Sequence, residues 1–269
     1  MTGGKRFLIG QYKPGSGYFY RLDPRTKIIL VISIMIAAII NTAFIFYGAL
    51  IVALILLLLS CQIGLGAIYK NLKPIFWFVV FTALFHLIFS GHNDPEKILR
   101  LGSVSVSRKA IEMAIIFSGR IVVFVLATFL ISLTTSPISI SEAVVSLVKP
   151  LRYIGVPVYD LGMIMFIALR FIPVLADEVE TVRKAQVIRG VEFSGNLWQR
   201  IKRSSALILP VFYSALRRAD DLSTAIETRG YRAGRPRTSL YPLKFSLIDT
   251  AVITAGMLVL VGAGWGRWC

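Results

Sequence analysis

Two arginine-glycine pairs, Arg189-Gly190 and Arg229-Gly230, are the residues of this sequence best suited to bind another molecule. Each pair ends a long stretch of helical periodicity that opens with Pro-Val. A guanidinium group can form two parallel hydrogen bonds with one carboxylate group, so each arginine suits a partner with an acidic residue. Because glycine is favoured just beyond a helix end and proline is tolerated in a first turn, the two stretches predict two helices with matched ends.

In both stretches the arginine continues an apolar stripe whose members recur at spacings of four and three. The stripes are Ala168, Ile172, Leu175, Val179 and Val182, followed by Gln186 and Arg189, and Ile208, Phe212, Ala215, Ala219, Leu222 and Ile226, followed by Arg229. The simplest alternative is that the arginines only complement the negative ends of the helix dipoles, which stabilises by about 0.3–1 kcal/mol. Two matched copies instead favour two docking points on a two-fold or pseudo-two-fold partner with an apolar groove and a carboxylate. The candidate docking residues are Gln186, Arg189, Gly190, Glu227, Arg229 and Gly230.

Other reactive constellations are weak. Asp220-Asp221 has no second acidic cluster with which it could hold a magnesium ion. The acids Asp177-Glu178 and Glu180 lie on a basic helix and are explained as partners of Arg183 and Lys184 one turn away. No Gly-x-x-x-x-Gly-Lys-Ser/Thr phosphate loop occurs, and two cysteines and two histidines make neither a disulfide framework nor a metal site. We expect no catalytic residue, no metal and no cofactor.

The composition assigns these features to a membrane protein. The chain has 269 residues, of which 56% are hydrophobic and only 16% charged, and its mean hydropathy is +0.72. These values exclude an ordinary soluble domain and a disordered chain. The net charge of +16 would suggest nucleic acid as the partner of a soluble protein. In so apolar a chain it indicates basic loops held on the cytoplasmic side, or an acidic protein partner, and no nucleic acid.

The expected fold is an all-α polytopic membrane protein with about five transmembrane helices and a cytoplasmic coupling domain of two long helices. The apolar run from Ile28 to Leu59 would be ~48 Å long as one helix, against a hydrocarbon core of ~30 Å, so it predicts two spans. The expected parts are 1–134, with spans at about 26–41, 43–61, 74–90 and 112–133, then the coupling domain 135–244, and then 245–269 with the last span.

The coupling segment contains apolar runs too short to cross a bilayer, and we expect its helices to lie at or below the membrane surface. As an alternative, residues 161–175 form a further span ending at Arg170. The basic residues place the N-terminus and 135–244 in the cytoplasm, and five spans then place Cys269 outside. Arg120 lies within the fourth span, where we expect it to pack against neighbouring spans rather than to contact a solute.

The sequence resembles the transmembrane T component of energy-coupling factor transporters, the CbiQ/EcfT family, over essentially its whole length. The segments Gly10–Gly15 and Arg21–Lys27 are similar to the family's N-terminus, and the order of spans, coupling helices and last span also matches. The two arginine motifs match as well. The family's motif is usually Ala-Arg-Gly or Ala-Arg-Ser, whereas here Ile188 and Thr228 precede the arginines.

The resemblance implies a multi-pass protein of the cell membrane without catalytic residues. Its two coupling helices would each bind one of two ABC-type ATPase subunits, and its membrane part would hold a small substrate-binding S component. ATP-driven motion would then move the S component, and vitamins or transition-metal ions would enter the cell. The N-terminal residues are closer to shared T components than to those dedicated to cobalt or nickel. Two alternatives are a self-contained carrier or channel and a membrane enzyme. The sequence has no pair of spans broken by glycine or proline, which argues against a carrier that binds its solute at the membrane midplane.

Overall fold

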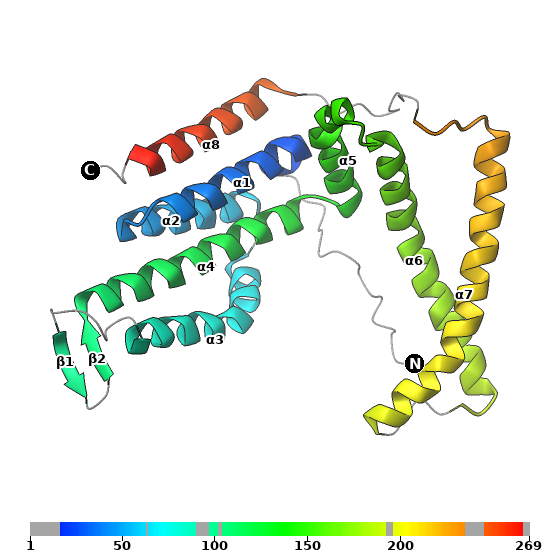
Figure 1. Ribbon diagram of the computed structural model, residues 1–269, viewed down its shortest axis with the longest axis horizontal. Coiled ribbons are helices and arrows are strands. Elements are labelled where there is room, and N and C mark those ends of the chain that lie inside the picture. The colour runs from blue at the N-terminus through cyan, green and yellow to red at the C-terminus, as the bar shows by residue number, and fades with distance from the viewer. Residues whose placement is uncertain are drawn as a thin grey trace. The chain divides into compact units, whose positions relative to one another are not determined.

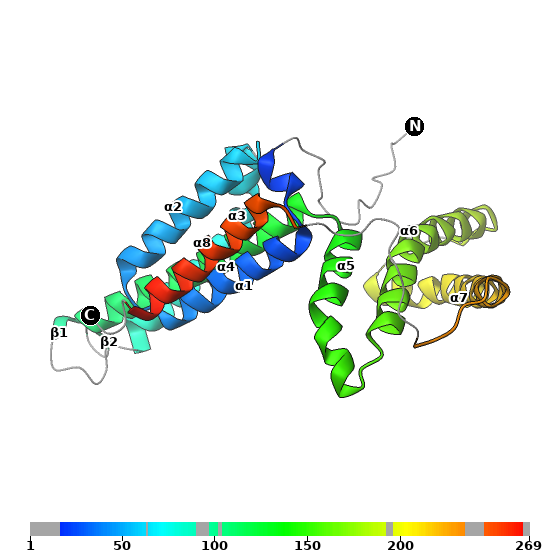
Figure 2. The same ribbon diagram turned by 90° about the horizontal axis from the view of Figure 1, so that it is seen from above.

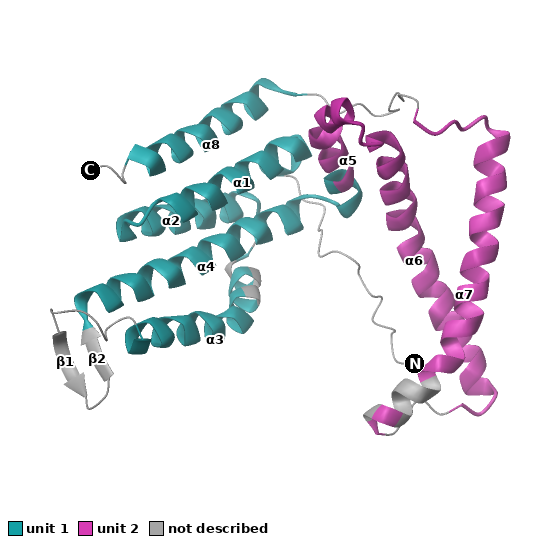
Figure 3. Ribbon diagram, in the orientation of Figure 1, with its two compact units in different colours: residues 1–140, 242–269 teal, residues 141–241 magenta. Residues whose placement is uncertain are grey.

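The computed structural model describes residues 17–62, 64–89, 97–101, 104–191, 196–234 and 245–265. Almost all of them are helical, which confirms the expected fold class. The chain divides into two compact units, one formed by 1–140 with 242–269 and the other by 141–241 (Figure 3). The segment Gly10–Gly15 and Cys269, both used above, lie outside the described residues.

The first unit is a bundle of long apolar helices. α4 contacts α1, α2 and α3, and α8 returns from the far end of the sequence to lie along α1 (Figures 1 and 2). A short 3-10 helix, Tyr18–Arg21, precedes the bundle. The bundle helices are α1 (Pro24–Ile40), α2 (Phe44–Ser60), α3 (Leu65–Phe89), α4 (Arg108–Thr134) and α8 (Leu247–Trp265).

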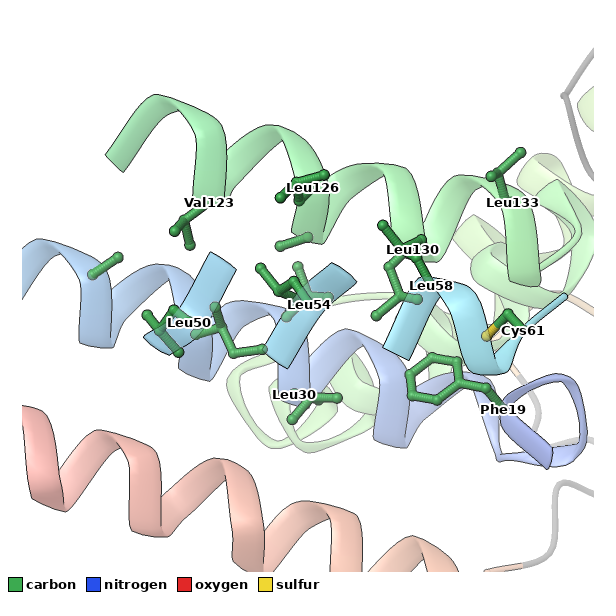
Figure 4. Packing of buried hydrophobic residues seen from close by; sticks show 14 of the residues in the cluster. Phe19, Leu30, Leu50, Leu54, Leu58, Cys61, Val123, Leu126, Leu130 and Leu133 are labelled. Atoms are coloured by element: carbon green, nitrogen blue, oxygen red, sulfur yellow. The ribbon is translucent and has the colours of Figure 1, made fainter. Parts of the chain in front are cut away.

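The core of this bundle lies where α2 packs on α4. Leu54 and Leu58 of α2 are buried against Leu126 and Leu130 of α4 (Figure 4). Their spacing of four places each pair on one side of its helix. Between helices in lipid this contact stabilises through close van der Waals packing, because the lipid tails are as apolar as leucine.

Several helices are long and apolar enough to cross a membrane. The candidate spans are Leu72–Phe89, Arg108–Thr134, Val158–Ile188 and Leu247–Trp265, with Phe44–Ser60 as a shorter apolar helix. The third of these candidates belongs to the segment that we expected to lie at or below the membrane surface. By length and composition it therefore fits the alternative in which this segment enters the membrane.

Polar side chains close the helix ends within the first unit. Asn41, between α1 and α2, accepts a hydrogen bond from the backbone N–H of Ala43 at 2.7 Å, and its side-chain amide donates to the carbonyl oxygen of Ala263 in α8 at 3.3 Å. Arg120 of α4 donates from Nε to the carbonyl oxygen of Ala38 at 3.1 Å and from Nη2 to that of Ile39 at 3.3 Å. Arg120 thus packs against a neighbouring helix end, as expected for a structural arginine.

A short β-hairpin joins α3 to α4, where we expected only a polar loop. Strand β1 (Lys97–Leu101) pairs antiparallel with β2 (Val104–Ser107), and Arg100 lies opposite Ser105. The sequence Val-Ser-Val-Ser of β2 alternates apolar and polar residues, which is the local signal of a strand. Ser107 then accepts a hydrogen bond from the backbone N–H of Ala110 at 3.3 Å and caps α4.

The second unit contains two long helices that pack on each other, α6 (Val158–Ile188) and α7 (Leu197–Thr228). They follow α5 (Pro137–Val148) and the 3-10 helix Lys149–Ile154. The expectation that Pro-Val starts each helix was wrong, because Pro173 and Pro210 lie inside them. Both helices are mostly exposed at this point, and each proline leaves one backbone carbonyl without its donor inside the helix.

Candidate functional site

The end of α6 is a Schellman motif. After Ile188, Arg189 occupies the cap position and Gly190 takes the left-handed conformation with φ +87°. The backbone N–H of Gly190 donates to the carbonyl oxygen of Val187 at 3.0 Å, and that of Val191 donates to the carbonyl oxygen of Gln186, also at 3.0 Å. These two bonds satisfy carbonyls that a helix end otherwise leaves unpaired, and glycine is favoured at this position because its φ is positive.

The end of α7 repeats this motif position for position. Gly230 has φ +74°, and its backbone N–H donates to the carbonyl oxygen of Glu227 at 2.9 Å. The N–H of Tyr231 donates to the carbonyl oxygen of Ile226 at 3.0 Å. Arg229 holds the same cap position as its counterpart in α6. The two similar sequence stretches therefore end in the same Schellman motif.

Both arginines are exposed, and the first has exposed apolar surface next to it. Arg189 and Arg229 are both exposed, and Ile188 next to the first is 86% exposed. The apolar stripe of α7 is uncovered at Ile208 and Phe212. An exposed cation with an exposed aliphatic neighbour has the chemistry of a helix that docks in an apolar groove ending in a carboxylate.

The other two candidate residues lie at these ends in supporting places. Gln186 is half-buried and Glu227 is exposed, and the backbone carbonyl oxygen of each accepts one hydrogen bond of its motif. Glu227 also accepts a hydrogen bond from the hydroxyl of Ser223 at 3.4 Å, one turn earlier. These contacts are local, and each of the two residues lies within one turn of its arginine.

Glu178 joins the two long helices, although the sequence had assigned it to a pair within its own helix. Its Oε2 lies 2.8 Å from Nη2 of Arg218, and its Oε1 accepts a hydrogen bond from Ser214 at 3.1 Å, both from α7. The expectation of a local partner was wrong because Glu178 faces α7 and is half-buried there. For Glu180 it was correct, since its carboxylate lies 2.9 Å from Nζ of Lys184.

Asp160, in the first turn of α6, makes a further contact that could not be predicted from the sequence. Its carboxylate contacts Tyr231 and Gly234, which follow the end of α7. The start of α6 therefore lies beside the end of α7, so the two helices run antiparallel and the arginines occupy opposite ends of the pair. No local pattern signals such contacts, because the partners are more than 70 residues apart in the chain.

Within the described ranges, no group of three or more histidine, cysteine, aspartate or glutamate side chains is placed to hold a metal ion. Asp220 and Asp221 are both exposed on α7. Cys61 is a buried free cysteine at the end of α2.

Candidate membrane spans packed as a bundle, followed by two long helices with matched arginine ends, are the architecture of a multi-pass membrane protein. The family model CbiQ, described as cobalt transport protein, matches residues 16–240. The chain belongs to this family.

Three relatives illustrate the similarity, and each carries the name energy-coupling factor transporter transmembrane protein EcfT. The protein of Clostridium kluyveri is 37% identical over 269 residues, covering 98% of this chain and 99% of the relative. That of Acidaminococcus fermentans is 36% identical over 263 residues, covering 96% and 97%, and that of Bacillus subtilis is 37% identical over 249 residues, covering 92% and 93%. The resemblance seen in the sequence is therefore confirmed: the chain is a multi-pass, non-catalytic transmembrane component of an energy-coupling factor transporter.

Proposed function

We propose that this chain couples two ABC-type ATPase subunits to a small S component that selects a vitamin or another micronutrient. The observation that carries the proposal is the repeated Schellman end, which exposes Arg189 and Arg229 in the same backbone setting. Because the arginines lie at opposite ends of an antiparallel pair, one chain can engage two subunits at once. The membrane bundle, 1–134 with 245–269, is then the part that holds the S component.

The physical basis of coupling is the length of the two helices. α6 has 31 residues and α7 has 32, so each is about 46–48 Å long. When ATP binding and hydrolysis change the distance between the ATPase subunits, each subunit moves the arginine end that is bound in its groove. The Glu178 contact to α7 lies between the two arginine ends, so a displacement at one end is transmitted across the pair.

The docking proposal is tested by removing the arginines. In Arg189→Ala or Arg229→Ala, one carboxylate of the partner loses its cation in a desolvated groove, which costs ~2–5 kcal/mol. The double variant is expected to lose the ATPase subunits in a pull-down and to lose uptake, while the S component stays bound. Lysine at either place rescues poorly, since its ammonium group cannot form the planar two-bond contact.

Arg235→Ala and Arg237→Ala are the matched controls, although both residues lie outside the described ranges. They follow α7 in the sequence, and we expect normal assembly from both. Normal assembly and transport by the Arg189/Arg229 double variant would instead show that the two arginines only complement the helix dipoles. The isolated chain should also hydrolyse no ATP above background.

The proposed orientation places the N-terminus and 135–244 in the cytoplasm, with the C-terminus outside. Cys269 is a natural probe once Cys61, which is 2% exposed, is replaced by serine. A membrane-impermeant thiol reagent is expected to label Cys269 on intact cells. Labelling that needs broken cells would mean an even number of spans or the inverse orientation.

A further inference from the structure

Asp160 ties the start of α6 to the segment behind the Arg229-Gly230 end of α7. Its Oδ1 accepts a hydrogen bond from the hydroxyl of Tyr231 at 3.0 Å. The backbone N–H of Gly234 lies 3.1 Å from both Oδ1 and Oδ2 and donates to the carboxylate. One side chain of α6 therefore accepts hydrogen bonds from two groups that lie just beyond the last turn of α7.

Tyr231, which follows the end of α7, forms a hydrogen bond with each of the two helices. Its backbone N–H closes the Schellman motif by donating to Ile226, and its hydroxyl donates to Asp160. Gly234 has φ +74°, a conformation that favours glycine, and in it the N–H points to the carboxylate. Arg229 is only two residues from Tyr231, so the same contacts that hold this segment restrict the direction in which the arginine end points.

We infer that Asp160 is a positioning residue that fixes the Arg229 end of α7 against the start of α6. The α6 end cannot be held in the same way, because Val191 stands at the position of Tyr231 and has no hydroxyl group. The two arginine ends thus share a backbone motif but differ in the side chain that follows the glycine. The consequence for docking rests on the proposed function, whereas the contact itself does not.

A double-mutant cycle separates positioning from general support of the fold. The purified full-length chain is titrated with the purified ATPase subunits, and the dissociation constant is measured for each variant. Asp160→Ala is expected to weaken assembly about tenfold, with no further loss in an Arg229→Ala background and the full tenfold loss in an Arg189→Ala background. Asp160→Asn keeps an acceptor oxygen for both donors and is expected to weaken assembly less than threefold. Asp177→Ala removes an exposed acid of the same helix and is the matched control, with no expected change.

A second measurement needs no ATPase. A spin label at exposed Ala233, in a background with Cys61 and Cys269 replaced by serine, reports the motion of the tied segment. Its mobility should rise in Asp160→Ala and in Tyr231→Phe, and stay unchanged in Asp177→Ala. Unchanged mobility in Asp160→Ala overturns the inference.

The two readouts distinguish the possible failures. Equal weakening of assembly in both arginine backgrounds would make Asp160 a general structural support and would also overturn the positioning role. If Arg229→Ala alone leaves assembly intact, the proposed docking function fails, and the spin label then decides by itself whether Asp160 fixes this segment.

Discussion

Lys27 donates a hydrogen bond from Nζ to the backbone carbonyl oxygen of Thr134 at 3.0 Å, which joins the first turn of α1 to the last residue of α4. The lysine is 2% exposed, and its ammonium group lies 5.6 Å from the centre of the Phe19 ring. A cation is well placed here, because the last carbonyls of a helix carry partial negative charge. The contact secures the end of α4 just before the chain continues into α5.

We predict that Lys27→Met destabilises the protein by about 1.5–3 kcal/mol, the range for a hydrogen bond that involves a charged group. Methionine fills a similar volume, so the loss reports the charge and its hydrogen bond rather than a cavity. Thermal unfolding of the detergent-purified protein measures the effect as a lower midpoint. Lys73→Met, at an exposed lysine of α3, is the matched control and should stay within about 0.5 kcal/mol. Equal midpoints for the two variants would mean that the Thr134 contact contributes nothing.

A second prediction concerns Arg120, which bonds the carbonyl oxygens of Ala38 and Ile39 and lies 3.3 Å from the hydroxyl oxygen of Tyr47. Arg120→Gln is expected to lower stability by about 1–3 kcal/mol, since the carbonyl oxygen of Ile39 loses its guanidinium donor and that of buried Ala38 keeps only the hydroxyl of Tyr47. Arg120→Lys should recover only part of this loss, because one ammonium group cannot serve acceptors in three places. Thermal unfolding gives the stability, and uptake of alternative solutes gives the selectivity. A change of solute selectivity at unchanged stability would contradict the structural role.

The features that could be predicted from the sequence are those encoded locally. A glycine after a helix needs no distant partner to take a positive φ, so both arginine ends were located correctly from their sequence alone. Apolar runs likewise predicted the helices of the bundle. Pro173 and Pro210 were misjudged because the first-turn preference of proline is only a preference. The hairpin was missed although Val-Ser-Val-Ser signals a strand.

Contacts between elements could not be predicted in this way. Glu178 is followed by Arg183 and Lys184 in its own helix, and only the packing of α6 on α7 decides that it pairs with Arg218 instead. Asp160 meets Tyr231 across 71 positions of sequence. Helical periodicity says which face a residue occupies but not which helix covers that face. The candidate docking residues were thus found from the sequence, whereas the side chains that hold their helices together were not.

The Glu178 contact gives a third prediction, tested by charge reversal. Glu178→Arg places two cations together between α6 and α7, and we expect weaker assembly with the ATPase subunits and a lower unfolding midpoint. Adding Arg218→Glu restores opposite charges and should recover most of both, although the Ser214 bond is changed. The Glu178 and Arg218 side chains are 25% and 43% exposed, so the recovered pair is worth only about 0.5–1 kcal/mol. A double variant no better than Glu178→Arg would show that the pair does not set the packing of the helices.

The last prediction tests the glycines of the two arginine ends. A Cβ atom added at Gly190 or Gly230 meets no atom within 4 Å, so alanine at either place is opposed only by the positive φ. That conformation costs about 1–2 kcal/mol for a residue with a side chain, which is about five- to thirtyfold in an equilibrium constant. Gly230→Ala should therefore weaken binding of the ATPase subunits within that range, because the helix end relaxes and turns Arg229 away. Gly230→Asn should weaken it less, since asparagine tolerates the left-handed conformation.

Gly262→Ala, inside α8 with equally open space around it, is the control and should leave binding unchanged. Binding constants from titration of the purified subunits decide the matter, and equal affinity for Gly230→Ala and the unaltered chain would show that the ATPase subunits do not require this helix end.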